Sequence, residues 1–199
     1  RKGKDEMPLE AAMLLWELGD QLGWKVLIDF LPRVEPGIQS KIVHLIWDAD
    51  SPELISPFTK IISNPTLDIE TKKKLIMGLG IIRDKTVIPV LIDALQKESM
   101  DVQMAIINVL GTFGESSLVE QIVPFLEYDH WKMRVAAALN LGLIGGPSVK
   151  EALLKQLKKE NYPPVRNVIY QRLGQFADVS FIPLFMEAFE KEKGNEGYD

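Results

Sequence analysis

The sequence predicts an all-α fold built from stacked pairs of helices, and three observations lead to this prediction. A Leu-Gly ending recurs along the chain, with its glycine at Gly80, Gly111, Gly142 and Gly174. These glycines lie 31, 31 and 32 residues apart, and a fixed period between 20 and 50 residues is typical of repeat proteins. Turn residues such as Pro, Gly and Asn separate apolar segments of helical length. About five to six helix pairs fit into the chain.

The composition indicates a folded chain with a continuous core. Hydrophobic residues make up 46% of the sequence and charged residues 26%, a balance that argues against disorder. No apolar run approaches the ~20 residues of a membrane helix, and the charged start leads into no signal-peptide core. The absence of Cys excludes disulfides and thiolate metal sites, so we expect a cytoplasmic protein. The first residue is Arg1 and not an initiator Met, which predicts a fragment of a longer polypeptide.

The first predicted helix covers residues 8–19, with Pro8 in its first turn and Gly19 at its end. We interpret it as the second helix of a repeat whose first helix is missing. Five helix pairs follow, and a sixth begins at Phe181. The predicted pairs are residues 24–31 with 38–47, 54–63 with 70–82, 87–97 with 102–113, 118–127 with 132–144, and 149–159 with 165–176.

These pairs predict a single elongated domain over residues 1–199. Its divisions are a half repeat at 7–20, repeats at 21–50, 51–83, 84–114, 115–146 and 147–178, a half repeat at 179–193, and a tail at 194–199.

The turns between repeats also share a pattern. Asp84, Glu115 and Asp178 each lie four residues after a repeated glycine, and Gly146 takes this place in the remaining repeat. A carboxylate there can accept the free N–H groups of the next helix, so we expect the acidic residues to act as caps. Pro124 lies deeper inside a first helix and is expected to kink it.

The unit from Asp129 to Gly145 has the pattern Asp-x-x-x-Met-Arg-x-Ala-Ala-x-x-x-Leu-Gly-x-x-Gly, and Val165-Arg166 with Leu173-Gly174 matches it again. This pattern resembles the HEAT-like repeat of the bilin lyase type over roughly residues 50 to 190. The resemblance implies a right-handed α–α superhelix, a HEAT-like solenoid with the second helix of each pair on the concave side. It also implies that the arginine of the repeat bonds carbonyls or carboxylates of adjacent turns. This position holds Gln39, Lys72, Gln103, Arg134 and Arg166.

Two rows of residues on the second helices share a face, because they lie seven and three positions before the repeated glycine. The first row is Ser40, Lys73, Met104, Val135 and Asn167, and the second is His44, Met77, Asn108, Leu139 and Gln171. If this face is concave, its apolar centre predicts a groove for a helix or extended segment of a partner. The alternative is that both rows pack as core, since periodicity alone does not separate two apolar faces. The candidate partner-binding residues are Met77, Met104, Asn108, Val135 and Leu139, with Trp131 beside a turn as an exposed anchor.

The charged and polar residues give no catalytic signal. Lys72, Lys73, Lys74, Arg134, Arg166 and Arg172 could form a basic stripe for phosphate. The net charge of −5 and the pI of about 5.2 favour a structural role for them. Neither His44 nor His130 has a second ligand at a metal-binding spacing, and we interpret His130 as a solvated or hydrogen-bonded turn residue. No phosphate loop, nucleophile elbow or HExxH motif occurs, so we expect no catalytic residue, metal or cofactor.

These observations predict a non-catalytic scaffold that binds a protein or peptide partner on the second-helix face, and two alternatives stay open. The resemblance to bilin lyase repeats implies an accessory role in bilin attachment, which visible absorbance after incubation with phycocyanobilin would reveal. A HEAT-like DNA glycosylase would need a basic face for damaged DNA, and the acidic chain argues against it. We therefore expect neither nucleic acid nor membrane as a partner.

The last predicted helix carries two apolar stripes. Phe181, Phe185 and Phe189 recur every four residues and are expected to pack on the fifth repeat. Ile182 and Met186 form the second stripe, and the polar segment after them predicts no further helix to cover it. We interpret this as a truncated repeat whose Ile182 and Met186 are covered by another copy of the chain or by parent sequence. Weak self-association through these two residues is the expected result.

Overall fold

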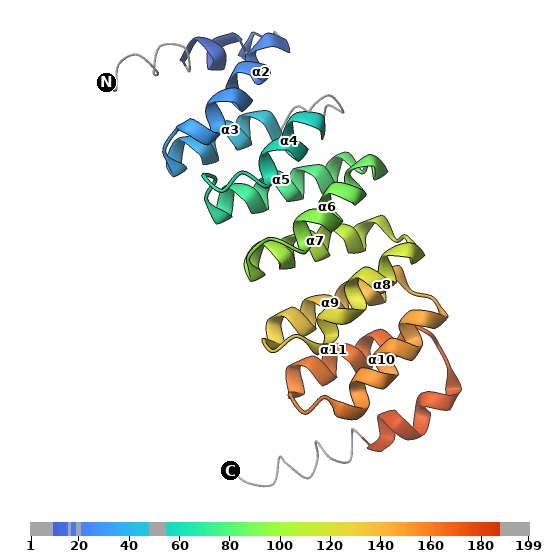
Figure 1. The fold of residues 1–199 in the computed structure, drawn as a ribbon. Helices are drawn as coiled ribbons and strands as arrows, with labels where there is room; N and C mark the ends of the chain where they lie inside the picture. The colour runs from blue at the N-terminus through green and yellow to red at the C-terminus, as the bar shows by residue number, and fades with distance from the viewer. Residues whose placement is uncertain (1–9, 16, 19–20, 48–54, 188–199) are drawn as a thin grey trace. The chain divides into compact units, whose positions relative to one another are not determined.

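The computed structural model describes residues 10–15, 17–18, 21–47 and 55–187 of the chain. Every regular element in these ranges is a helix, and they contain no strand, so the predicted all-α fold is confirmed (Figure 1). The chain divides into two compact units, residues 1–113 and 114–199, and this boundary lies one residue before the predicted division between repeats 84–114 and 115–146. The single-domain assignment stays a prediction, and each unit is described by itself.

The first unit contains three consecutive pairs of helices. Its elements are α2 (Gln21–Phe30), η1 (Leu31–Arg33), α3 (Pro36–Trp47), α4 (Ile55–Ile62), α5 (Ile69–Ile82), η3 (Lys85–Val87), α6 (Ile88–Leu95) and α7 (Met100–Phe113). The second helices α3, α5 and α7 pack side by side in chain order, while α4 packs on α5 and α6 on α7 (Figure 1). Residues 10–15 before α2 are also helical, within the predicted helix at 8–19.

The second unit repeats this arrangement. Its elements are η4 (Ser116–Leu118), α8 (Val119–Ile122), η5 (Val123–Glu127), α9 (Trp131–Ile144), α10 (Pro147–Lys159), α11 (Pro163–Gly174) and η6 (Val179–Phe181), and residues 182–187 continue as a helix. The expected kink at Pro124 is confirmed, because α8 ends after four residues and the chain continues as a 3-10 helix at η5. Proline has no N–H group to extend the α-helical ladder, which explains the change.

Small side chains allow the second helices to pack closely. In the first unit, a Cβ atom added at Gly80 of α5 would lie 3.0 Å from both methyl groups of Val109 on α7. In the second unit, Ala136, Ala137 and Ala138 are all buried in α9, which packs against α11 and η5. Gly80 and the three alanines of α9 therefore lie where neighbouring helices come close together.

Two of the three predicted acidic caps are confirmed. Asp84 accepts a hydrogen bond from the Thr86 amide, and Asp178 accepts one from the Ser180 amide. These bonds lower the pKa of Asp84, and the pKa of Asp178 falls well below its ordinary range because Lys150 also donates to it. The prediction for Glu115 is wrong, since its side chain makes no cap hydrogen bond. Its additional methylene carries the carboxylate beyond the amides that an Asp side chain reaches.

The last described helix confirms the predicted packing of Phe181 and Phe185 on the fifth repeat. Phe181 is buried, and the Phe185 ring makes edge contacts with the rings of Phe181 and Tyr170, with centroids 6.1 and 5.9 Å apart. Tyr170 lies on α11, so these phenylalanines pack on the fifth repeat as expected. Phe189 lies outside the described residues. No helix among the described residues is long and apolar enough to cross a membrane.

Candidate functional site

The residue at the arginine position of each repeat bonds a turn, which the resemblance implied for the arginines alone. Gln39 donates to the carbonyl of Val34 at 3.1 Å, and Gln103 donates to that of Leu95 at 2.9 Å. Lys72 instead reaches forward to the next turn, where its ammonium lies 2.7 Å from a carboxylate oxygen of Glu98. The position therefore holds turns in place even where it is not an arginine.

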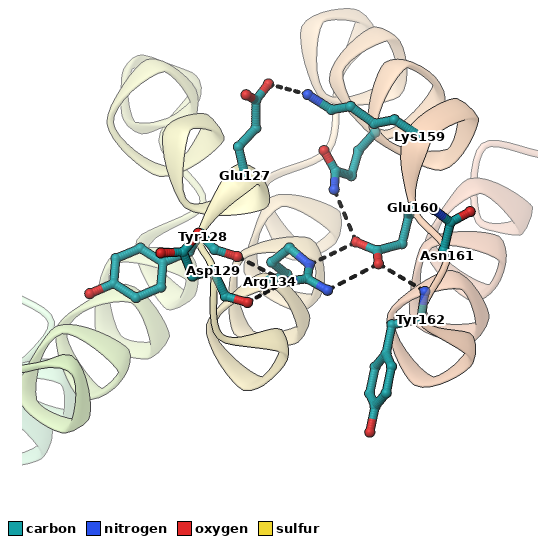
Figure 2. Close-up of a pocket in the computed structure, with 9 residues that line it drawn as sticks. Glu127, Tyr128, Asp129, Arg134, Lys159, Glu160, Asn161 and Tyr162 are labelled. Atoms are coloured by element: carbon teal, nitrogen blue, oxygen red, sulfur yellow. Dashed lines mark hydrogen bonds and ion pairs between the residues drawn. The ribbon is translucent and has the colours of Figure 1, made fainter.

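Arg134 makes both kinds of contact and is the centre of the site in the second unit (Figure 2). Its Nη1 donates to the backbone carbonyls of Tyr128 and Asp129, at 2.9 and 2.8 Å. Its Nε and Nη2 donate to the two carboxylate oxygens of Glu160, at 2.8 and 3.1 Å. A bidentate pair of this kind is the strongest geometry open to arginine and a carboxylate.

Glu160 is buried and every lone pair of its carboxylate is used. Besides the two bonds from Arg134, Oε2 accepts from Gln156 at 3.0 Å and Oε1 accepts from the backbone amide of Tyr162 at 3.0 Å. Burial alone would raise the pKa of Glu160. The hydrogen bonds to its carboxylate, led by that from Arg134, have the larger effect together, so its pKa lies below the ordinary value. Arg166 also donates to the Glu160 backbone carbonyl at 2.7 Å, which fixes this turn from a second helix.

A recess of about 560 Å³ opens beside this ion pair, wholly within the second unit. Figure 2 shows Arg134 between the loop that carries Tyr128 and Asp129 and the segment that carries Glu160 and Tyr162. The residues that line the recess are Glu127, Tyr128, Asp129, Arg134, Gln156, Lys159, Glu160, Asn161 and Tyr162.

Three rings stand at the N-terminal ends of α9 and α11 next to the recess. The Trp131 and Tyr162 ring centroids are 5.2 Å apart and tilted by 41°, and His130 stacks on Trp131 at 6.2 Å. Trp131 is half-buried and Tyr162 is exposed. His130 caps α9 by accepting the amide of Lys132, so the prediction of a hydrogen-bonded turn residue is confirmed.

The predicted partner-binding residues of the first unit lie at or near its surface. Met77 on α5 has 48% of its surface exposed, Asn108 on α7 is exposed, and Met104 is half-buried. In the second unit, Val135 and Leu139 on α9 are half-buried, as is Trp131. Since the first group lies in one unit and the second in the other, they remain two separate candidate surfaces, and their role stays a prediction.

Sequence reasoning missed two exposed apolar residues on the same helices. Ile81 is 56% exposed and Leu143 is 55% exposed, and each directly follows a repeated glycine. Each also lies four residues after a predicted one, Met77 or Leu139, so the pair shares a helix face. The repeat period itself could have identified them, because both occupy one position of the repeat.

The basic residues are largely engaged by the protein, as the structural interpretation predicted. Lys72 is buried against Glu98, Lys73 pairs with Glu70, and Lys74 donates to the Ser40 hydroxyl. With Arg134 and Arg166 bonded to turns, the predicted stripe is occupied by intramolecular contacts at these positions. No group of three or more His, Asp or Glu among the described residues is arranged to hold a metal ion.

Comparisons with known proteins agree with the repeat architecture. The family of HEAT repeats matches the sequence at residues 55–129, 88–174 and 119–195, which together cover more than half of the chain. Comparison with curated protein sequences gives no match. The suspected resemblance to HEAT-like repeats is confirmed by the family match.

Two solved structures are similar to this chain. The structure of the complex of CpcE and CpcF of phycocyanin lyase from Nostoc sp. PCC7120 is similar with a TM-score of 0.54 and 19% identity, covering 90% of this chain and 74% of that chain. Human deoxyhypusine hydroxylase in complex with glycerol gives a TM-score of 0.47 and 16% identity, covering 89% and 81%. At these identities the first likeness concerns the fold alone, and the second carries no argument.

Proposed function

Because the chain belongs to the HEAT-repeat family, we propose that it is a non-catalytic scaffold that binds a protein or peptide segment on the exposed face of its second helices. The proposal places the protein in the cytoplasm, in keeping with a chain that has no Cys. HEAT-type repeats stack into extended surfaces, and such surfaces are suited to a partner that lies along several helices.

The observation that supports this proposal is an exposed apolar pair on one second helix of each unit. Met77 with Ile81 on α5, and Leu139 with Leu143 on α9, occupy the same two positions of the repeat. Three of these four side chains are about half exposed or more, while the neighbouring Ile76, Leu79 and Leu141 are fully buried. Exposed apolar groups that recur at one repeat position are typical of a binding surface.

The next repeat in each unit has polar residues at these positions. Asn108 and Thr112 follow on α7, and Gln171 and Gln175 follow at the end of α11. Each unit therefore presents one apolar pair and, one repeat later, one hydrogen-bonding pair. An amphipathic helix, with an apolar stripe beside amide-binding polar residues, matches this surface best. Burial of one Leu, Ile or Met side chain on binding contributes roughly 1.5–3 kcal/mol, so one pair is enough for a measurable effect.

The test begins with a phage-displayed library of amphipathic helical peptides selected against the full chain. Fluorescence anisotropy with a selected peptide then compares wild type with the variants Met77→Ser/Ile81→Ser and Leu139→Ser/Leu143→Ser. At least one of the two is expected to weaken binding by about tenfold or more, because interface anchors of this kind dominate affinity. Circular dichroism must show unchanged helicity in both variants.

A matched control is Glu151→Ser/Lys155→Ser, which changes two exposed residues four apart on the first helix α10. Its affinity is expected to equal that of wild type. The variants Met104→Ser and Val135→Ser test the half-buried row of residues on the second helices. If such a variant has a lower melting temperature but unchanged affinity, the residue belongs to the core. Equal binding by all variants, or a library that yields no binder, would contradict the proposal.

A further inference from the structure

Arg172 is the one member of the predicted basic stripe whose side chain has no partner among the described residues. The other members, Lys72, Lys73, Lys74, Arg134 and Arg166, are engaged by the protein. The guanidinium group of Arg172 makes no hydrogen bond and no ion pair with any described residue. Its Nε is buried without an acceptor, while its Nη atoms are not fully buried. Since an unpaired buried donor is costly, an acceptor from another molecule would stabilise this side chain.

The stem of Arg172 crosses α9 next to the exposed apolar pair of the second unit. A Cβ atom added at Gly142 would lie 2.2 Å from Cδ of Arg172, and the guanidinium group is bonded to this Cδ. Leu143 directly follows Gly142, and Leu139 lies about one helical turn before it. Leu143 is 55% exposed and Leu139 is half-buried. The unpaired cation therefore lies beside an apolar surface that is open to a partner.

The two helices that form this surface contain no acidic residue. α9 and α11 contain Lys132, Arg134, Arg166 and Arg172 and neither Asp nor Glu. Arg134 and Arg166 are bonded to turns. Lys132 lies 5.8 Å from the centroid of the Trp131 ring and has no ion pair with a described residue. The surface of α9 and α11 is therefore positive, although the whole chain has a net charge of −5.

α9 and α11 run side by side in the same direction, so one partner helix can contact both. At the start of α9 the ring of Trp131 contacts the ring of Tyr162, just before α11, with centroids 5.2 Å apart. Near the other end, Gly142 of α9 meets Arg172 of α11. The apolar pair on α9 and the exposed glutamines on α11 therefore lie on neighbouring helices, with Arg172 where these helices touch.

We propose that this surface binds an acidic amphipathic helix, in which an Asp or Glu side chain pairs with Arg172 while apolar side chains cover Leu139 and Leu143. The inference rests on the proposed function and names the chemistry of the partner. A carboxylate can accept two N–H groups of one guanidinium, and covering the leucines excludes water from this pair. A nucleic acid would match the charge but not the two leucines, and the acidic chain repels its phosphates.

The experiment uses three capped helical peptides, each as long as α9 and each carrying the same stripe of Leu residues. Both flanks of this stripe carry Glu in the first peptide, Gln in the second and Lys in the third. Fluorescence anisotropy with the full chain is expected to show that the Glu peptide binds about three- to tenfold more tightly than the Gln peptide. The Lys peptide is expected to bind more weakly than both, because like charges then face each other.

A double-mutant cycle assigns this preference to Arg172. Arg172→Gln keeps part of the stem and removes the charge, so affinity for the Glu peptide is expected to fall by about three- to tenfold, and affinity for the Gln peptide by less than about twofold. Arg172→Lys keeps the charge without the planar fork and is expected to retain part of the preference. Lys158→Gln removes the same charge from the exposed surface of α10, and both affinities are expected to equal those of wild type. Circular dichroism must show unchanged helicity in all three variants.

Four outcomes would overturn the inference. If wild type binds the Glu and Gln peptides equally through Leu139 and Leu143, the scaffold proposal survives and the acidic partner is excluded. An equal loss of both peptides in Arg172→Gln would show that Arg172 acts by packing and not by pairing. Binding of a single-stranded oligodeoxynucleotide that depends on Arg172 and is as tight as that of the Glu peptide would assign the surface to phosphate. If none of the three peptides binds, the inference fails, whereas the peptide library still decides the proposed function.

Discussion

The side chain of Arg172 on α11 lies across α9 at Gly142. A Cβ atom added at Gly142 would lie 2.2 Å from Cδ, 2.6 Å from Cγ and 3.0 Å from Cβ of Arg172. The Arg172 Nε is buried and has no hydrogen-bond partner among the described residues, so the arginine packs here mainly through its aliphatic stem. Gly80 has the same relationship to Val109 in the first unit. Gly80 and Gly142 therefore lie where two consecutive second helices come close together.

Replacement of Gly142 by Ala is expected to destabilise the protein by about 1 kcal/mol or more, although Ala favours helix more than Gly does. The added methyl group would displace the base of the Arg172 side chain and not only its flexible end. Urea unfolding followed by circular dichroism would measure the change. Gly174→Ala is the matched control, because nothing lies within 4 Å of a Cβ atom at Gly174, and it is expected to be neutral or slightly stabilising. A loss of stability at both positions would contradict this explanation.

Replacement of Ala137 by Glu is expected to be severely destabilising, by about 3 kcal/mol or more, since it buries an unpaired carboxylate. Ala137 has no exposed surface and lies where α9 meets its neighbours. Lys155→Glu on the exposed face of α10 is expected to be nearly neutral. Thermal unfolding compares the two variants, and equal melting temperatures would show that the assigned faces are wrong.

Replacement of Glu160 by Gln is expected to remove a pH-dependent part of the stability. The pKa of Glu160 is lowered in the folded protein, so its contribution is complete above the unfolded value of 4.5 and is lost as the pH falls through the lower folded pKa. Near neutral pH the variant is expected to lose roughly 2–4 kcal/mol, because Arg134 keeps its charge without its partner. Unfolding curves from about pH 7 to about pH 3 would test this. The gap between wild type and variant should narrow towards acid, and a constant gap would contradict the assignment.

Ile182 is 58% exposed and Met186 is 54% exposed, so both side chains are accessible to a second copy of the chain. We predict that analytical ultracentrifugation at high protein concentration shows a weak dimer. Met186→Lys is expected to weaken it, because a charge in an apolar contact must be desolvated. Lys158→Glu, on the exposed surface of α10, serves as the control. A chain that is monomeric at every concentration would refute the prediction.

The repeat period predicted most of the fold because each turn uses the same local chemistry. Helix α5 begins one residue before its predicted start and ends where predicted, and α7 begins two residues early. The arginine position was also predictable, since hydrogen bonds from Arg134 and Arg166 to nearby carbonyls depend on short separations along the chain. Glu115 differs because capping depends on side-chain length and not on charge alone.

The candidate sites were harder to predict, because their key contacts join residues that are far apart in sequence. Glu160 follows a lysine-rich helix end and resembles a solvated residue, yet it is buried against Arg134, 26 residues earlier. The pair of Lys72 with Glu98 has the same separation of 26 residues, which is the one signal that could have indicated it. The exposure of Ile81 and Leu143 could not be predicted, because each helix has two apolar faces and only one of them packs on a neighbouring helix. Both faces have the same helical period in the sequence.

The hydrogen bonds that join one repeat to the next have a kinetic consequence. They span 26 residues from Lys72 to Glu98 and from Arg134 to Glu160, and 34 residues in the bond from Thr66 to Pro32. Closing loops of this length costs little more entropy than closing shorter ones, and chains with local contacts fold fast. In such an array folding can begin at any repeat and spread to its neighbours. Amide hydrogen exchange is therefore expected to show each unit opening repeat by repeat and not in a single step.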